Sequence, residues 1–261
     1  MNTGRTFLDP QTVFASTPLK EMESAMLTMT FMNEVQATFH PATATRVLDA
    51  MQVAALLHKG QTRKNRADLP VTPYIEHPLR NAIRLQRMGV ADPSTLIAAL
   101  LHDTVEDCLA KLLLIYCAAD VESMELEEAR ALAYEWITAR FDMVAADTVR
   151  NVTNDPAPKG ATKIEKRALY REHTVASIRK NLQTFLVKFV DFKDNAASLV
   201  YIVDAKNSAM VASMAAKYLP MVDEFRSALE LYLDLLDPET IDSINASLDS
   251  IERQLKDLLA D

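Results

Sequence analysis

Apolar residues recur along most of this chain at intervals of three and four, the spacing that places them on one face of an α-helix. The pattern predicts helices over about 42–57, 78–88, 93–107 and 174–203, and one or two more within 109–140. A short helix is expected around 22–31, and amphipathic helix continues from 205 to 261. Proline-containing stretches at 68–78 and 151–160 are expected to be loops.

Composition agrees with an all-α fold. Apolar residues make up 49% of the chain, and only four of its 261 residues are glycine, which argues against a turn-rich β fold. We see no internal repeat, no low-complexity segment and no second-domain boundary. The pattern therefore predicts an N-terminal arm with one helix over residues 1–40, followed by a single helical domain over 41–261.

The net charge and the cysteines of this chain limit the classes of function that it can have. The net charge of −8 makes the surface as a whole repel DNA and anionic membranes, so an anionic substrate requires a local basic patch. Cys108 and Cys117 show no metal-binding spacing and are expected to be buried free thiols in a reducing compartment, which favours a cytoplasmic protein. No signal peptide and no apolar run of membrane-spanning length is present.

The stretch Leu100–Asp107 closes a strongly apolar helix that Asp92 can cap and Pro93 can begin. On a continuous helix, Asp103 shares a face with Glu106 and Asp107, so three carboxylates crowd a helix end where the dipole disfavours negative charge. A divalent cation bound by His102 and Asp103 would remove this repulsion. The alternative is a solvated acidic helix end that happens to contain a histidine.

Three other features are candidates for the same site. The run His58–Arg66 is strongly basic, and is either a solvated loop or a phosphate-facing one. His77 precedes Pro78 at a helix start, where it is a ligand or a cap. Lys188, Asp191, Asn195 and Ser198 share one helix face, either as a solvent face or as a liganded polar stripe, because a bare buried carboxylate is costly.

Several motifs together resemble one known family. "HKGQTRK", "PYIEHP", "ALLHDTVEDC", "VRNVTND", "KIEKR" and "VKFVDFKDN" occur in the order and near the spacing of the HD-type alarmone hydrolases, which comprise the RelA/SpoT hydrolase domain and the Mesh-type small alarmone hydrolases. The resemblance covers about residues 53–199, leaving 200–261 as additional C-terminal helices. It implies an HD-domain helical bundle and hydrolysis of (p)ppGpp to GDP or GTP and pyrophosphate, by a stand-alone enzyme.

The resemblance also implies roles for individual residues. One Mn²⁺, with Fe²⁺ or Zn²⁺ as alternatives, would be held by His77, His102, Asp103 and Asp191. Glu106 and Asp107 match the pair that orients or deprotonates the attacking water. The remaining positions match residues that bind the substrate's base, ribose or phosphates: Arg63, Lys64, Lys163, Lys188, Asn195 and Ser198.

Departures from the family pattern leave the substrate open. The connector from Arg63 to Tyr74 is longer than usual, Phe192–Asp194 replace the common residues after Asp191, and 109–128 resembles an insertion. The alternatives are the same chemistry on ppApp, on pyrophosphorylated tRNA ends or on NADPH, as an antitoxin to a toxic small alarmone synthetase. A third possibility is a non-catalytic HD domain that binds a nucleotide or a protein.

Overall fold

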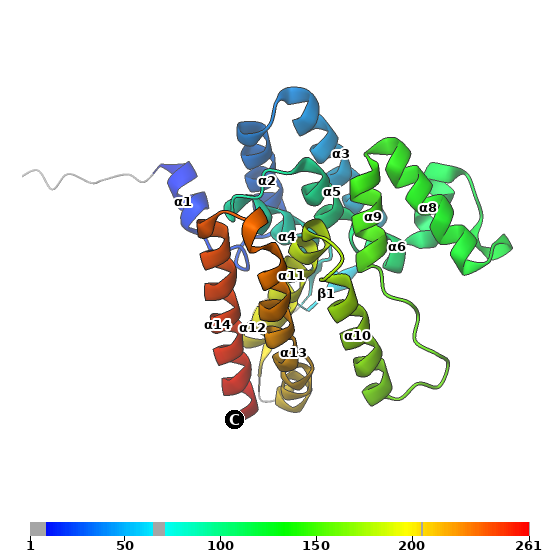
Figure 1. Cartoon of the computed structure of the whole chain (residues 1–261). Helices are drawn as coiled ribbons and strands as arrows, with labels where there is room; N and C mark the ends of the chain where they lie inside the picture. The colour runs from blue at the N-terminus through cyan, green and yellow to red at the C-terminus, as the bar shows by residue number, and fades with distance from the viewer. Residues whose placement is uncertain (1–8, 65–70, 205, 261) are drawn as a thin grey trace, which may run out of the picture.

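The computed structural model describes residues 9–64, 71–204 and 206–260, and these form a bundle of α-helices (Figure 1). The expectation of an all-α fold is confirmed, since the described strands are limited to one antiparallel pair of two residues each. The N-terminal half contains α1 (Pro10–Ser16), α2 (Ser24–Thr38), α3 (Pro41–Leu57), β1 (Thr62–Arg63), β2 (Thr72–Pro73), α4 (Glu76–Arg87), α5 (Pro93–Leu101), α6 (Thr104–Asp107), α7 (Leu109–Leu112), η1 (Leu113–Cys117) and η2 (Val121–Ser123).

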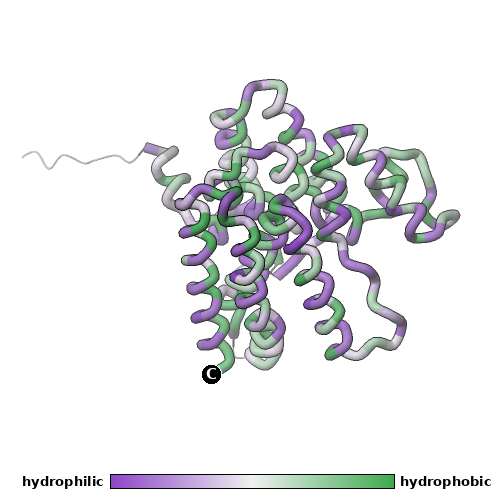
Figure 2. Tube along the Cα trace, in the orientation of Figure 1, coloured by the Kyte–Doolittle hydropathy of each residue, from purple (hydrophilic) through white to green (hydrophobic). Residues whose placement is uncertain are grey.

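The C-terminal half is also helical. It contains α8 (Leu126–Arg140), α9 (Met143–Val152), α10 (Lys163–Ser177), α11 (Leu182–Ala197), α12 (Leu199–Ile202), α13 (Ser208–Leu229), η3 (Glu230–Leu235) and α14 (Pro238–Ala260). Along α14, hydrophilic and hydrophobic residues alternate in bands (Figure 2), because one face of this helix packs against α13 and α11. None of the described helices has the length and apolar character needed to cross a membrane.

Helix α5 lies at the centre of the bundle. Asp92 caps it by accepting a hydrogen bond from the Thr95 amide at 3.1 Å, and Pro93 occupies its first turn, as the sequence predicted. Every residue from Thr95 to Leu101 is buried, because α5 packs against α3, α4, α9 and α11. A helix buried on all sides holds its C-terminal end in a fixed position relative to its neighbours.

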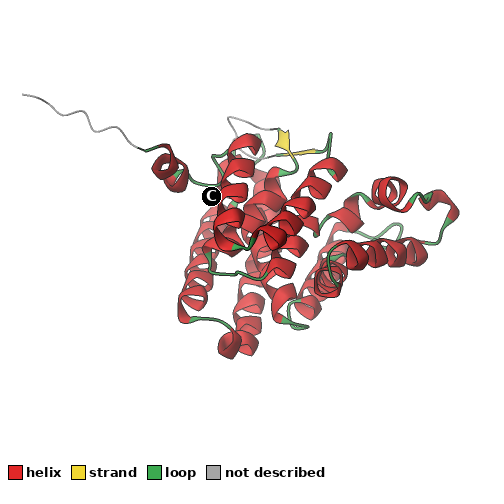
Figure 3. Ribbon diagram, turned by 90° about the horizontal axis from the view of Figure 1, so that it is seen from above, coloured by secondary structure: helices red, strands yellow, loops and turns green. Residues whose placement is uncertain are grey.

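Residues 109–128, which we predicted to be an insertion, project from one side of this bundle together with α8 (Figures 1 and 3). The prediction of one or two helices over 109–140 was too simple. The chain forms α7, continues as the π-helical turn η1, reverses at Ala118 with a φ of 49°, and resumes as η2 and α8. Cys117 is only half-buried, contrary to the expectation of a buried thiol, whereas Cys108 is buried and both are free.

Two further boundaries differ from the prediction. The helix expected over 174–203 is divided, because Asn181 caps a new helix by accepting from the Thr184 amide at 2.8 Å. The helix expected to run through Asp107 ends at Leu101, and α6 begins after a turn at His102 and Asp103. At that turn the Thr104 hydroxyl donates to the Leu101 carbonyl at 2.6 Å. Side-chain hydrogen bonds of this kind compete with helix continuation.

The N-terminal segment contains two described helices rather than the predicted one; residues 1–8 lie outside the described range. Helix α2 packs against α3 and α4, and its Leu27, Phe31 and Val35 are fully buried. The same segment places Met22 and Lys20 in the interior. Residues 20–38 therefore contribute to the core beside α4, the helix that carries His77.

Candidate metal centre

Four of the predicted site residues meet where α4, α5 and α11 pack together. His77 lies in the first turn of α4, His102 and Asp103 follow the end of α5, and Asp191 lies in the middle of α11. His77 and His102 are nearly inaccessible to solvent, with exposures of 1% and 3%. Their rings lie edge to face, with centroids 5.1 Å apart. Segments far apart in sequence are thus brought to one point by the packing of three helices.

The ligand atoms of these residues surround a common space. His77 Nε2 lies 3.1 Å from Asp191 Oδ1 and 3.7 Å from Asp103 Oδ2. His102 Nε2 lies 3.0 Å from Asp103 Oδ2 and 3.7 Å from Asp191 Oδ1. One atom each from His77, His102 and Asp191 lies within 4.8 Å of the others, close enough for one metal ion. Asp103 extends this set because its Oδ2 lies within the same distance of both imidazoles.

The opposite nitrogen of each imidazole is held by a hydrogen-bond acceptor. His77 Nδ1 lies 2.7 Å from Asp194 Oδ2, and His102 Nδ1 lies 2.9 Å from the Ala99 carbonyl oxygen. In a neutral ring these contacts place the proton on Nδ1 and leave the Nε2 lone pair facing the centre. His102 Nε2 is also buried, and it faces the carboxylates of Asp103 and Asp191. This donor set fits a divalent cation with mixed nitrogen and oxygen ligands.

Electrostatics at the centre also favour a cation. Burial alone would raise the pKa of Asp191, but hydrogen bonds and charges from His102 and His77 outweigh burial and hold that pKa well below its usual range. Burial would lower the pKa of His102, yet Asp103 and Asp191 raise it well above the ordinary value. The two aspartates are therefore ionised and stabilise positive charge between them, which is what a bound metal ion requires.

The Glu106–Asp107 pair lies in α6, one turn beyond Asp103. Glu106 Oε2 accepts hydrogen bonds from both the backbone and side-chain nitrogens of Asn154, each at 2.9 Å. Burial, with the charges of Asp103 and Glu106, raises the pKa of Asp107 to about 6. A carboxylate with this pKa is ionised at neutral pH and is a better proton acceptor than an ordinary aspartate.

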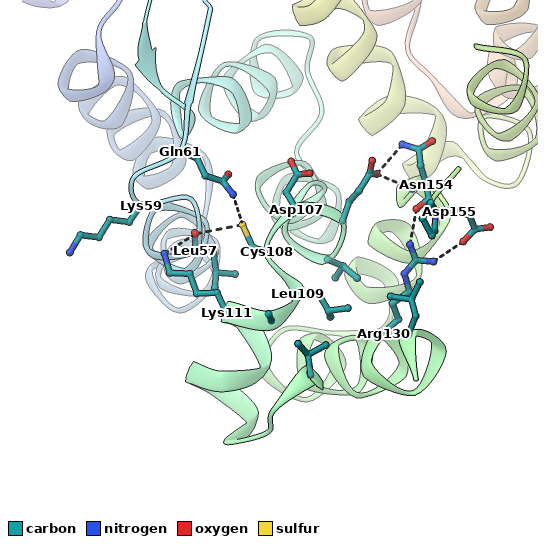
Figure 4. Close-up of a pocket in the computed structure, with 16 residues that line it drawn as sticks. Leu57, Lys59, Gln61, Asp107, Cys108, Leu109, Lys111, Arg130, Asn154 and Asp155 are labelled. Carbon is teal, nitrogen blue, oxygen red and sulfur yellow. Dashed lines mark hydrogen bonds and ion pairs between the residues drawn. The ribbon is translucent and has the colours of Figure 1, made fainter. Parts of the chain in front are cut away.

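Asp107 borders a cavity of about 560 Å³ that opens beside the centre (Figure 4). The cavity lies between Lys59 and Gln61 on one side and Arg130 and Asp155 on the other. Its floor includes Cys108, whose thiol lies 3.4 Å from Gln61 Nε2. Burial, together with the Asp107 charge, raises the pKa of Cys108 to about 11, so the thiol is protonated at neutral pH and is not a nucleophile.

Two of the predicted substrate-binding residues, Arg63 and Asn195, are linked to the metal centre by successive hydrogen bonds. Arg63 Nη2 donates to Asn195 Oδ1 at 2.6 Å, and Asn195 Nδ2 donates to Asp191 Oδ1 at 2.6 Å. The Arg63 guanidinium also lies over the Tyr74 ring, 5.5 Å from its centroid. Tyr74 in turn donates from its hydroxyl to Asp103 Oδ2 at 2.6 Å. The described part of the basic loop thus reaches the metal centre through Arg63; residues 65 and 66 lie outside the described range.

The other predicted substrate residues lie at different distances from the centre. Lys64 is exposed, and Lys188 is buried on α11 with 4% exposure. Ser198 follows the end of α11 and donates to the Asp194 carbonyl. Lys163 donates to Ser213 Oγ at 2.7 Å, so its ammonium group is held against α13. The α10 lysine that lines a cavity with Glu106 is Lys166.

Sequence reasoning missed the role of Asp194, which was noted only as a departure from the family pattern. This fully buried carboxylate accepts from His77, twice from Arg80 (2.8 and 2.9 Å), and from Arg84 Nη1 at 2.6 Å. Arg80 and Arg84 share a face of α4 with His77 at spacings of three and four. That spacing, read with the extra aspartate in α11, was the available signal for this network.

A helical bundle in which a His-Asp pair after a buried helix meets a histidine and an aspartate from two other helices defines the HD class of proteins. No family model matches the chain. Curated proteins do match it. A Xenopus tropicalis protein named guanosine-3′,5′-bis(diphosphate) 3′-pyrophosphohydrolase MESH1 is 34% identical over 149 residues, covering 57% of this chain and 66% of the relative.

Two other relatives carry the same activity in their names. An Aquifex aeolicus guanosine-3′,5′-bis(diphosphate) 3′-pyrophosphohydrolase is 29% identical over 182 residues, which is 70% of this chain and 22% of the relative. The human MESH1 protein is 48% identical over 65 residues, which is 24% of this chain and 35% of the relative. The chain thus matches less than two thirds of the length of each. It belongs to the family of HD-type hydrolases that includes the Mesh-type proteins.

Proposed function

We propose that this protein hydrolyses the 3′-pyrophosphate of guanosine alarmones, so that (p)ppGpp and water give GDP or GTP and pyrophosphate. The observation that carries the proposal is the convergence of two imidazoles and two carboxylates on one point, next to a carboxylate with a raised pKa. The names of the relatives supply the substrate.

We assign His77, His102, Asp103 and Asp191 as ligands of one Mn²⁺ per chain, with Fe²⁺ and Zn²⁺ as alternatives. The carboxylate content of the site favours a harder metal among these three. When bound, such an ion lowers the pKa of a water molecule and offsets the charge of a diphosphate. Asp194 and the Ala99 carbonyl act on the ligands themselves, because each fixes the orientation and tautomer of one imidazole.

The protein's own groups would then move the proton and position the water. Asp107 accepts a proton from the attacking water, for which a pKa of about 6 is well matched near neutral pH. Glu106, fixed by its two hydrogen bonds from Asn154, orients the same water through its remaining oxygen. A fixed carboxylate loses little entropy in the reaction and so contributes through positioning.

Substrate binding is assigned to the basic groups near this centre. Arg63, already stacked over Tyr74, offers its guanidinium face to the guanine ring, and Lys64 lies next to it. Asn195 and Ser198 are assigned to the ribose and phosphates, and Lys188 and Lys163 to phosphate charge. The free thiols suit a reducing compartment, so we place the activity in the cytoplasm.

Incubating the Mn²⁺-loaded protein with ppGpp and separating the products by anion-exchange chromatography tests the proposed reaction. Equal amounts of GDP and pyrophosphate are expected, with no activity in Asp103→Asn and full activity in the surface control Asp257→Asn. Unchanged ppGpp with the metal site filled would refute the proposal. Faster turnover of ppApp, of pyrophosphorylated tRNA or of NADPH would keep the chemistry and change the assigned substrate.

A further inference from the structure

Asn154, the residue that holds Glu106, lies in a part of the chain without helix or strand. The connection from α9 to α10 spans residues 153–162 and runs along one edge of the molecule (Figure 1). Glu106 Oε2 accepts two hydrogen bonds from this connection, from the backbone and side-chain nitrogens of Asn154. An irregular segment has no repeating backbone hydrogen bonds, so the position of Asn154 depends on individual contacts.

Arg130 in α8 supplies such a contact. Its Nη2 donates to the Asn154 carbonyl oxygen at 2.7 Å, and its Nη1 donates to Asp155 Oδ1 at 2.6 Å. Figure 4 shows the Arg130 side chain directed toward both residues. The guanidinium group is planar and rigid, so two donors on one plane restrict the orientation of the Asn154 peptide unit more than a single donor would.

The Arg130 side chain is largely buried, whereas its acidic partners are not. Its side-chain exposure is 10%, compared with 81% for Asp155 and 86% for Glu127. Ion pairs with such exposed carboxylates contribute little to stability. A buried guanidinium group needs hydrogen-bond acceptors to offset its desolvation, and the Asn154 carbonyl is one of them. We therefore expect the contact with Asn154 to matter more than the contact with Asp155.

We propose that Arg130 is a positioning residue for Glu106 and acts through Asn154. A continuous series of hydrogen bonds leads from Arg130 to the Asn154 carbonyl, and from the Asn154 nitrogens to Glu106. The series fixes one oxygen of Glu106, so the other keeps a constant direction toward the attacking water. This inference rests on the function proposed above, which gives Glu106 its role. Helix α8, which projects from the bundle, thereby contributes to the reaction.

Steady-state kinetics of the Mn²⁺-loaded protein on ppGpp test this role. Arg130→Met removes the donors but keeps a long side chain, and it should lower kcat about 10- to 100-fold, because displacing a positioned catalytic group costs rate on this order. KM should stay the same, since Arg130 acts on the group that orients water and not on substrate binding. Arg140→Met is the matched control, because Arg140 lies exposed on the same helix and should be replaceable without loss of kcat.

A double-mutant cycle distinguishes positioning of Glu106 from a general structural role. In Glu106→Ala, Asn154 has no carboxylate to hold, so Arg130→Met should cause no further loss of kcat in that background. The same loss of kcat in both backgrounds, or a wild-type kcat in Arg130→Met, would overturn the proposal. Thermal melting of each variant checks that it is folded.

Amide hydrogen exchange measured by NMR tests the same contacts without substrate, with Zn²⁺ in place of Mn²⁺ because Zn²⁺ is not paramagnetic. The Asn154 amide donates to Glu106 and should exchange about tenfold faster in Arg130→Met than in the wild type. The adjacent Thr153 amide donates to the Val149 carbonyl at 3.0 Å, at the end of α9, and should keep its exchange rate. Unchanged exchange at Asn154 would overturn the proposal. A wild type that leaves ppGpp intact would refute the proposed function, and this measurement would still decide whether Arg130 holds Asn154.

Discussion

At the scale of single residues, the centre depends on groups that hold the ligands as much as on the ligands. Asp194 is the clearest case, because one fully buried carboxylate orients His77 and neutralises Arg80 and Arg84. Burial would raise the pKa of Asp194, but the two guanidinium groups hold it well below its usual range. The group is therefore ionised at neutral pH, where it accepts a hydrogen bond from His77.

Replacing Asp194 by asparagine should weaken metal binding about 10- to 100-fold, because the neutral amide is a weaker acceptor than the carboxylate that fixes the tautomer of His77. Mn²⁺ affinity can be measured by electron paramagnetic resonance of the free ion, with Asp257→Asn as the control for loss of a surface charge. A folded Asp194→Asn protein with unchanged Mn²⁺ affinity would contradict the orienting role.

Protonation of Asp107 should cause the loss of activity at low pH. Its carboxylate form is the active one, and its pKa is raised to about 6, so kcat/KM of metal-saturated protein should fall about tenfold per pH unit below that value. Asp107→Asn should lower kcat by about 10²- to 10⁴-fold. Asp155→Asn is the matched control, since Asp155 borders the same cavity. Retention of both rate and acid limb in Asp107→Asn would exclude it as the base.

Sequence motifs locate individual candidate site residues best where chemistry restricts the residue type. The positions of His77, His102, Asp103 and Asp191 follow from motifs, and the structure brings all four together. Lys163 is different, because a flexible lysine on an exposed helix can point to either side. Its ammonium group is held by Ser213, while Lys166, one turn further along, faces the cavity next to Glu106.

At the scale of secondary-structure elements, caps and turns set helix boundaries that hydrophobic periodicity does not reveal. Hydrophobic spacing is continuous from 174 to 203, but the Asn181 cap divides it and sets where α11 begins. Periodicity likewise runs through His102 without interruption. The structure ends α5 at Leu101 and begins α6 at Thr104, so His102 and Asp103 lie in the turn between the two helices. The sequence contained the capping residues, but propensity alone does not rank them above a continuous apolar pattern.

Helix α2 should behave as part of the same folding unit as the metal centre. Phe31 is fully buried against the bundle, so Phe31→Ala should lower the free energy of unfolding by about 3–5 kcal/mol. Met29 lies on the same helix at 55% exposure, and Met29→Ala should change stability by no more than about 0.5 kcal/mol. Urea denaturation followed by circular dichroism distinguishes the two. Equal, small effects would mean that α2 is not part of the cooperative core.

At the scale of the whole molecule, an acidic protein gathers basic side chains at particular places in the fold. The net charge is −8, yet Arg63 lies beside the metal centre and Lys20, Arg84 and Lys193 surround a cavity behind it. Composition showed that the net charge is negative and that an anionic substrate would need a local basic patch. Composition could not locate these basic groups, because Lys20 and Lys193 are 173 positions apart in sequence and line the same cavity only in the folded chain.

The most direct test of the whole account is a titration of Mn²⁺ into metal-free protein, with bound metal and ppGpp hydrolysis measured on the same samples. We predict that activity rises in proportion to bound Mn²⁺ and levels off at one ion per chain, and that Asp191→Ala shows neither the binding nor the activity. Hydrolysis that persists in excess chelator, or full occupancy by Mn²⁺ without hydrolysis, would contradict it.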